Sequence, residues 1–417
     1  MRLILPALLL SSLSVFGAEP TTHATTAING LGIDLLHQTH PGANALLSPY
    51  SIQSALAMTY AGADGATRAE MAKVLRYPSD NAELHRSFAG LREALEGVMQ
   101  KSVKDAERMQ QRGGRVDPIT LTTANRLFGQ TGFAFREPFL ELVKSSYAAP
   151  FVPLDFRRNS SAATKHINGW VGEQTRERIR NLIPDGALNQ GTRLVLVNAI
   201  YLKAPWEHEF YESATRPQPF YLGANNLITV TSMRSEQTLG YAKHLDFTAV
   251  MIPYRGGELQ FLVLLPDKVD GLADLEKKLT ADLLGDFADA KNQKVILHLP
   301  KFKLEPPAMT LSRSLQALGM RSAFDKPPRS ANFDRMAPRT PDDYLFVSEV
   351  FHKTFLNLDE KGTEAAAATA VAMVATNAAE WKPAKPIEVR VDRPFLFAIQ
   401  HRASGACLFL GRVNDPR

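Results

Sequence analysis

The segment that most constrains this 417-residue chain lies near its C-terminus, where residues 360–376 read EKGTEAAAATAVAMVAT. No charged residue occurs between Glu364 and Glu380. Long loops in compact proteins are usually functional, and a charge-free, proline-free run with β-branched residues can also pair as a strand. We therefore interpret this segment as having two conformations, an exposed loop first and an inserted strand later.

The alternation of side chains supports a strand, because successive residues of a strand point to opposite faces. One face would grow from small to large residues and could pack on a core: Thr363, Ala365, Ala367, Thr369, Val371 and Met373. The other face begins with the charge of Glu364 and stays small. An alanine-rich helix is the alternative, but isolated helices of this length are marginal and no amphipathic stripe is visible.

Composition places the chain among globular proteins, with 22% charged residues and a net charge of +5. Lysines and arginines are scattered, so no nucleic-acid partner is expected. A basic stretch over residues 101–118 is interpreted as a solvated helix end and loop, with a polyanion site as the less favoured alternative. Length alone suggests two or three domains, but no Pro/Ser-rich linker divides the chain, which favours one compact domain over residues 19–417.

The first eighteen residues have the pattern of an export signal. Arg2 precedes an apolar run over residues 3–10, and small residues lead to a plausible cleavage point near Gly17 or Ala18. An uncleaved membrane anchor is the alternative, but the run is short and interrupted by serines. We expect a secreted protein, extracellular or, in a bacterial source, periplasmic, with no membrane partner.

Cys407 is the only cysteine, so the chain can form no intramolecular disulfide and no cysteine-based zinc cluster. It lies in the apolar run ACLFL at residues 406–410, which is typical of a buried strand. We interpret it as an inert core residue and not as a nucleophile.

Helices and strands are predicted in mixed order, without a repeating strand–helix–strand rhythm. This order favours an α+β fold with large, mainly antiparallel sheets. The run at residues 193–202 predicts a central strand buried on both faces, within which Asn198 must find polar partners. Helices are expected at 49–62, 67–75, 81–99 and 161–181, and strands at 121–128, 193–202, 261–265, 295–299, 344–358 and 395–400.

Several common catalytic motifs are absent from the sequence. There is no G-x-S-x-G or S-x-x-K pattern, and no P-loop or G-x-G-x-x-G. His208 and Glu209 begin an H-E-x-x-H pattern, but Glu212 stands where the second histidine would be. We expect no catalytic residue, no cofactor and no metal site, although a triad of distant residues stays open at this stage.

Residues 360–369 resemble the reactive-loop hinge of inhibitory serpins almost residue for residue. Further segments resemble serpin motifs in the same order along the chain: 44–52 (NALLSPYSI), 198–206 (NAIYLKAPW), 299–302, 352–353, 393–397 and 409–413. Two stretches, 101–118 and 376–393, look longer than is usual in the family.

The resemblance implies the serpin fold: a large central, mainly antiparallel sheet with further sheets, about eight to nine helices, and an exposed reactive loop at about residues 360–385. It also implies a protease inhibitor and not an enzyme. Insertion of the cleaved loop into the main sheet is a known property of serpins. The alternative is a non-inhibitory serpin acting as a binding or carrier protein, but the bulky or charged hinge residues of such members are absent here.

The resemblance also assigns roles to individual residues. The family spacing of sixteen residues from Glu360 places the reactive bond between Thr376 and Asn377. The hinge comprises Glu360, Gly362, Thr363, Glu364, Ala365, Ala366, Ala367, Ala368 and Thr369. Residues of the structural switch beneath and beside the sheet opening are Ser51, Ser54, Asn198, Trp206, Lys301 and His352, of which Lys301 is expected to pair with Glu360.

The expected partner is one target protease bound to a serpin monomer. The loop contains no lysine or arginine from Gly362 to Trp381, which disfavours trypsin-like enzymes. Ala375 and Thr376 suit an elastase-like or subtilisin-like serine protease, and Met373 leaves a chymotrypsin-like enzyme or a papain-like cysteine protease open at an alternative bond.

Overall fold

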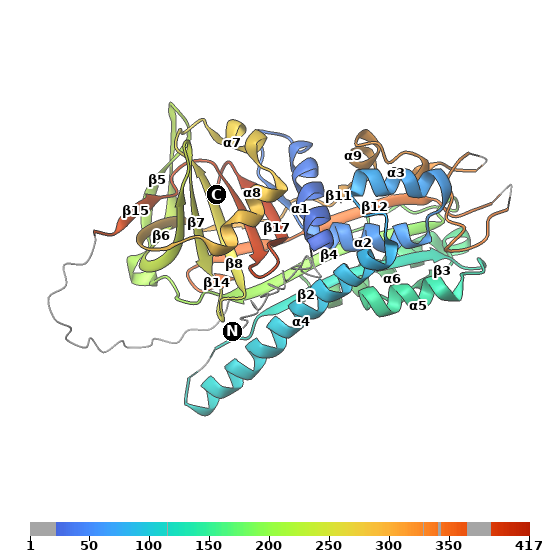
Figure 1. Ribbon diagram of the computed structural model, residues 1–417, viewed down its shortest axis with the longest axis horizontal. Helices are drawn as coiled ribbons and strands as arrows, with labels where there is room; N and C mark the ends of the chain where they lie inside the picture. The colour runs from blue at the N-terminus through green and yellow to red at the C-terminus, as the bar shows by residue number, and fades with distance from the viewer. Residues whose placement is uncertain (1–21, 115, 328, 341–342, 365–384) are drawn as a thin grey trace, which may run out of the picture.

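The computed structural model describes residues 22–114, 116–327, 329–340, 343–364 and 385–417. The predicted signal peptide and the predicted reactive bond lie outside these residues. Two β-sheets with helices packed around them form the described part (Figure 1). Its α-helices are α1 (Thr22–His37), α2 (Pro49–Gly62), α3 (Gly65–Leu75), α4 (Asn81–Gln111), α5 (Glu137–Tyr147), α6 (Phe156–Gln174), α7 (Leu272–Lys278), α8 (Ala281–Gly285) and α9 (Ser312–Ala317).

The first sheet has nine strands and is antiparallel except where β15 runs parallel to β9. Its order places the C-terminal strands of the chain beside the short N-terminal strand β1. In spatial order the strands are β1 (Ala45–Leu47), β17 (Ala406–Val413), β16 (Phe395–His401), β8 (Leu259–Pro266), β7 (Phe247–Pro253), β6 (Asn226–Lys243), β9 (Asn292–Pro300) and β15 (Ile387–Arg390), with β5 (Arg216–Gly223) on β6.

The second sheet has eight strands and carries the hinge. Its longest strand, β4, pairs antiparallel with β2 and parallel with β12, so the mainly antiparallel character predicted from the sequence is confirmed but the central pair is parallel. The strands are β10 (Phe302–Leu304), β13 (Leu356–Asp359), β14 (Gly362–Thr363), β4 (Leu194–Pro205), β12 (Val347–Thr354) and β11 (Met309–Thr310), with β2 (Thr120–Gln130) on β4 and β3 (Val152–Leu154) on β2.

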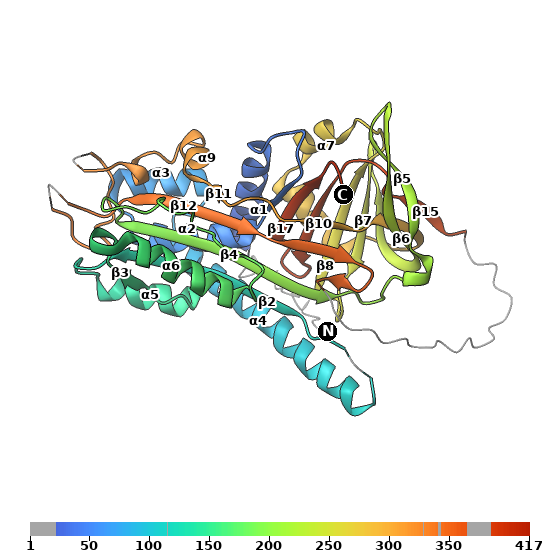
Figure 2. The same ribbon diagram turned by 180° about the vertical axis from the view of Figure 1, so that it is seen from behind.

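Strand β4 is buried on both faces, as its continuous apolar run predicts. Leu196 and Ile200 pack into the core that contains α2, whereas Val195 and Val197 pack into a second core that contains α6. The two helices therefore cover opposite faces of the sheet, with α2 in front in Figure 1 and α6 in front in Figure 2. This division fixes which residues of the hinge face which side.

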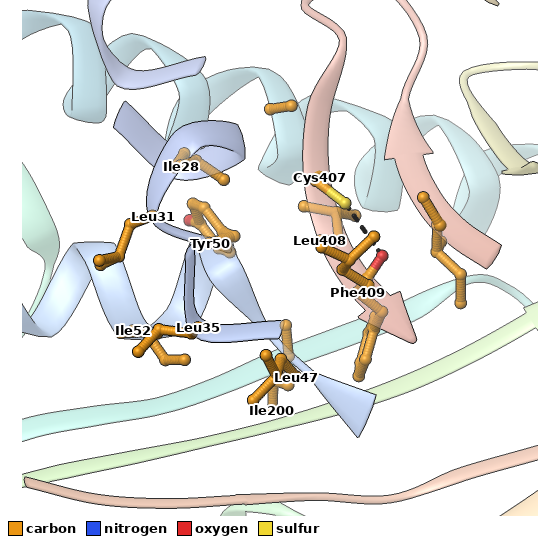
Figure 3. Packing of buried hydrophobic residues seen from close by; sticks show 14 of the residues in the cluster. Ile28, Leu31, Leu35, Leu47, Tyr50, Ile52, Ile200, Cys407, Leu408 and Phe409 are labelled. Carbon is orange, nitrogen blue, oxygen red and sulfur yellow. Dashed lines mark hydrogen bonds between the residues drawn. The ribbon is translucent and has the colours of Figure 1, made fainter. Parts of the chain in front are cut away.

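The larger core joins α1, α2 and the C-terminal strand β17 (Figure 3). Cys407 is fully buried there, and its thiol donates to the backbone oxygen of Phe409 at 3.0 Å. Burial raises the pKa of the Cys407 thiol far above its ordinary value. A thiol that stays protonated in an apolar core is a poor nucleophile, in agreement with the inert role expected for it.

Helix α2 begins where the sequence predicts it to begin, because the Ser48 hydroxyl accepts the backbone N–H of Ser51 and Pro49 occupies the first turn.

The C-terminal ends of two helices, α4 and α6, were predicted wrongly. Helix α4 continues to Gln111, just before Gly113 and Gly114, and its last turns extend beyond the two sheets (Figure 1). The basic residues from 101 to 111 are therefore helical, where a helix end and loop were predicted.

Helix α6 was predicted to end at residue 181 but ends at Gln174. The hydroxyl of Thr175 donates to the Val171 oxygen at 2.8 Å, and Arg176 and Glu177 then take left-handed backbone conformations, with φ of 50° and 62°. Residues with positive φ cannot continue a right-handed helix. The segment that follows α6 instead lies against the sheet, where Ile179 and Leu182 are buried.

Candidate functional site

The described part of the hinge, residues 360–364, enters the second sheet between two strands. Strand β14 pairs antiparallel with β13 on one side and with β4 on the other, so that Gly362 lies opposite both Asp359 and Pro205. The φ of Gly362 is 148°, and a Cβ atom there would lie 2.1 Å from the Ala204 oxygen. Only glycine fits this close approach to the backbone of β4.

Thr363 turns its side chain toward the core and is 1% exposed. Its hydroxyl lies 2.5 Å from the hydroxyl of Tyr254, whose ring stacks on Trp206 with 4.6 Å between centroids. Burial raises the pKa of Tyr254 strongly, so the hydroxyl stays neutral. Thr363 is thus seated on a buried aromatic pair, on the face of the sheet where the predicted loop strand would pack.

Glu360 and Lys301 form the ion pair that the resemblance implies, with Lys301 Nζ 2.7 Å from Glu360 Oε2. Thr215 donates to the other carboxylate oxygen at 2.9 Å. Burial alone would raise the pKa of Glu360, but the hydrogen bonds from Lys301 and Thr215 help outweigh it and the pKa is lowered. The carboxylate is therefore held ionised just before the hinge enters the sheet.

Trp206 is fully buried and hydrogen-bonds to the same turn. Its indole N–H donates to the Asp359 oxygen at 3.0 Å, and its backbone N–H donates to the Lys361 oxygen at 2.9 Å. The tryptophan therefore binds the backbone on both sides of Glu360, which fixes the position of the hinge relative to the end of β4.

A buried polar cluster, comprising Ser48, Ser51, Asn125, Asn198 and His352, joins α2 to the centre of the same sheet. His352 Nδ1 lies 2.5 Å from Asn198 Oδ1, and His352 Nε2 accepts the backbone N–H of Ser48 at 3.1 Å. The Ser51 hydroxyl lies 2.6 Å from Asn125 Oδ1 and 3.2 Å from Asn198 Oδ1. The cluster therefore links α2 with strands β2, β4 and β12.

Burial lowers the pKa of His352 to about 3. The imidazole is consequently neutral at physiological pH, with its proton on Nδ1 facing Asn198 and its Nε2 free to accept from Ser48. A neutral network with every member bonded avoids the cost of a buried charge.

Ser54 lies outside the polar cluster, although the resemblance groups it there. Its hydroxyl donates to the Tyr50 oxygen in its own helix at 2.8 Å, and it lines a polar cavity of about 220 Å³ together with Asn125 and Arg92. The remaining hinge residues and the reactive bond lie outside the described residues: Ala365, Ala366, Ala367, Ala368, Thr369, Thr376 and Asn377.

Three contributors to the site were missed at the level of sequence. Asn125 carried one signal, because it is a polar residue within the predicted strand at 121–128; that it lies opposite Asn198 is seen only in the sheet register. Tyr254 and Arg178 carry no local signal, since their roles arise only from contacts with Thr363 and Glu364.

Within the described ranges, no group of three or more histidine, cysteine, aspartate or glutamate side chains is arranged to hold a metal ion. In the part of the chain that the structure covers, no helix combines the length and the apolar character needed to cross a bilayer.

Comparison with known proteins identifies the family. The family model described as Serpin (serine protease inhibitor) matches residues 26–416. The chain belongs to the serpin family. This serpin is 36% identical over 391 residues to the leukocyte elastase inhibitor of Bos taurus, covering 91% of this chain and 95% of the relative. It is 35% identical over 378 residues to Serpin B4 of Homo sapiens, covering 89% and 94% respectively.

Solved structures agree with this assignment and confirm the predicted fold. The serpin superposes on Serpin48 of the insect Tenebrio molitor with a TM-score of 0.77 and 29% sequence identity, covering 95% of this chain and 98% of the other. The described residues form an α+β fold with a nine-stranded sheet, an eight-stranded sheet and nine α-helices. This is the serpin fold.

Proposed function

We propose that this serpin inhibits serine proteases as a suicide substrate. The protease attacks the bond between Thr376 and Asn377 and forms an acyl-enzyme through its nucleophile. The hinge released by cleavage then inserts between β4 and the β12–β13 edge and carries the bound protease along. Distortion of the protease triad and oxyanion hole stops deacylation, which depends on tightly held geometry.

One observation carries the proposal: Gly362 and Thr363 already occupy strand positions between β13 and β4. Direct pairing of β4 with β12 runs only as far as Ile200 and Thr354, and beyond these residues β14 lies between the two edges. The start of an added strand is thus present in the uncleaved chain.

Residues 365–370, which would follow the hinge into the sheet, are all small, and the strand would be long enough for the mechanism. A strand from Thr363 to Thr376 would span roughly 46 Å at about 3.3 Å per residue. Adding backbone hydrogen bonds along such a length makes the inserted state the more stable one. The uncleaved fold must then be held by a kinetic barrier.

For the target, we propose an elastase-like or subtilisin-like serine protease. Ala375 and Thr376 offer small side chains to the specificity pocket, and no lysine or arginine occurs from Gly362 to Trp381. The relative in Bos taurus is named as an elastase inhibitor, which supports the same class. We further propose that the serpin acts as a monomer.

The deciding experiment mixes the purified serpin with elastase, subtilisin, chymotrypsin, trypsin and papain. A covalent complex that survives denaturing electrophoresis, together with mass spectrometry of the released C-terminal peptide, is the expected result. The peptide should begin at Asn377, within one or two residues. Cleavage without any trapped protease would reject inhibition and leave the binding or carrier role as the interpretation, and cleavage beyond Glu380 would reject the assigned bond.

We also propose that the chain is exported with removal of residues 1–18. The basic residue Arg2, the apolar run and the small residues near Gly17 support this assignment. N-terminal sequencing of the protein from its natural source should give a first residue close to Glu19. An intact N-terminus on protein from inside the cell would contradict it.

A further inference from the structure

We propose that Arg178, on the segment between α6 and β4, is a positioning residue that holds the hinge at the point where it enters the sheet. The proposal rests on the loop-insertion function above and adds a residue outside the reactive loop that controls it. The contact that carries it joins the guanidinium of Arg178 to the carboxylate of Glu364.

Strand register places Glu364 on the face of the sheet opposite to Thr363. Thr363 lies opposite Ala204, which belongs to the core on the α2 side, so the next hinge residue points to the α6 side. Arg178 follows the end of α6 on that same side. The two hinge residues therefore have partners on opposite faces of the sheet. Tyr254 contacts Thr363 on the α2 side, and Arg178 contacts Glu364 on the α6 side.

Glu364 is also the residue at which the hinge leaves the regular ladder. Its backbone N–H still donates to the Asn357 oxygen of β13 at 2.9 Å, but its φ of 50° turns the chain away from the strand conformation. Left-handed backbone is unfavourable for a residue with a side chain and persists only where the surroundings impose it. The ion pair with Arg178 is the charged side-chain contact that the structure shows at this turn.

The surroundings of Glu364 make Arg178 the decisive cation. The Glu364 side chain is 11% exposed, and its Oε2 atom is buried without a hydrogen-bond partner among the described residues. Burial raises the pKa of Glu364, and Arg178 acts most strongly to lower it, ahead of Lys203 and Arg176. Lys203, the nearest lysine on β4, is already paired with Asp117 at 2.7 Å.

The backbone and the guanidinium of Arg178 both have contacts that fix their positions. Its backbone N–H donates to the Thr175 oxygen at 3.0 Å, and the next residue, Ile179, is buried in the second core. The guanidinium also lies over the Phe355 ring, 5.7 Å from its centroid, between β12 and β13. The arginine thus spans from the segment over the sheet to the edge along which the loop would insert.

Removing Arg178 would leave the Glu364 carboxylate partly buried and unpaired, a state that costs more than its exposure to water. We expect the hinge to withdraw from the sheet and insertion after cleavage to begin later. A slower start gives deacylation more time, so more protease escapes as free enzyme. The inhibitor becomes in part a substrate.

The test compares Arg178→Ala with the matched control Arg180→Ala. Arg180 is an exposed arginine of the same segment, and among the described residues its side chain forms an ion pair with Glu177 alone. Hydrogen exchange at the Glu364 amide should be at least about fivefold faster in Arg178→Ala and unchanged in the control. The number of serpin molecules consumed per protease inhibited should rise in the same variant, and Arg178→Lys should restore part of both values.

A second variant keeps the test decisive if the first folds poorly. Glu364→Gln removes the charge from the other side, and the double variant Arg178→Ala/Glu364→Gln should show much less than the sum of the two single effects. Unchanged exchange at Glu364 in Arg178→Ala, or strictly additive effects, would overturn the positioning role. If the unmodified serpin traps no protease, the proposed function fails, while the exchange measurement still decides whether Arg178 positions the hinge.

Discussion

His352 and Asn198 occupy paired positions on the parallel strands β12 and β4, and His352 Nδ1 lies 2.5 Å from Asn198 Oδ1. This hydrogen bond crosses the boundary between the two strands that the inserted loop would have to separate. It closes the sheet at its centre, whereas β14 occupies the same boundary at its end. The polar cluster and the hinge therefore both lie along the boundary between β4 and the β12–β13 edge.

The first prediction concerns pH. Burial lowers the pKa of His352 from about 6.5 to about 3, so between these values the unfolded chain binds a proton that the folded chain does not. The contribution of His352 to the free energy of unfolding is therefore fully present above pH 6.5. It falls as the pH drops below 6.5, by roughly 1.4 kcal/mol per pH unit. The urea midpoint should be lower at pH 5 than at pH 7.5.

The matching variant is His352→Gln, which should have a lower midpoint at pH 7.5 and a shallower decline toward pH 5. His85, whose pKa burial lowers to about 4, adds a similar slope that remains in this variant. The control His208→Gln removes an exposed histidine and should leave the profile unchanged. An equal slope in the His352 variant would contradict the neutral buried imidazole.

The second prediction concerns Gly362→Ala. A Cβ atom would collide with the Ala204 oxygen, and the φ of 148° is outside the range that alanine adopts easily. The hinge should leave the sheet, which hydrogen exchange at Thr363 and Glu364 would detect. Gly97→Ala, where a Cβ has open space on α4, is the control and should change neither exchange nor inhibition. Normal protection in the Gly362 variant would refute the close approach.

Thr363→Arg should convert the inhibitor into a substrate. Thr363 is buried against Tyr254, so an arginine there would have to be desolvated before the strand could form. Loop insertion would then be slower than deacylation, and the protease would be released as free enzyme. The measurement is the molar ratio of serpin to protease at full inhibition, with Thr363→Ser as the control that keeps the hydroxyl. An unchanged ratio in the arginine variant would argue against loop insertion as the inhibitory step.

Lys301→Ala should destabilise the native fold by roughly 1–3 kcal/mol, because it leaves the buried Glu360 carboxylate without its cation. Glu360→Gln in the same chain should recover part of the loss, since the unpaired charge is then gone. Denaturant unfolding of the two variants at pH 7.5 measures this. A single variant as stable as the parent would mean that the pair contributes nothing.

The last prediction is the target class. Elastase should be trapped covalently at a higher rate than trypsin, because residues 375 and 376 are small and no basic residue is available for a trypsin pocket. Association rates measured under excess serpin give the comparison. Replacing Thr376 by arginine should reverse the preference. Rapid trapping of trypsin by the unmodified serpin would refute it.

The hinge illustrates how much of this site a sequence can predict. The run EKGTEAAAAT located the segment through its resemblance to the serpin hinge, and the close approach of Gly362 to the backbone of β4 gives the physical reason for its glycine. The pairing of Lys301 with Glu360 also followed from the family motifs and is present in the structure. The grouping of Ser54 with the polar cluster was not found, because its hydroxyl bonds within its own helix.

Local pattern alone determined the start of α2, the doubly buried strand β4 and the buried state of Cys407, since capping, apolar runs and burial are properties of neighbouring residues. Only the tertiary structure decided that β4 lies parallel to β12, that Tyr254 supports Thr363, and that Arg178 meets Glu364. Each of these contacts joins residues more than a hundred positions apart. Such contacts depend on how whole strands and helices pack, which no local pattern of the chain encodes.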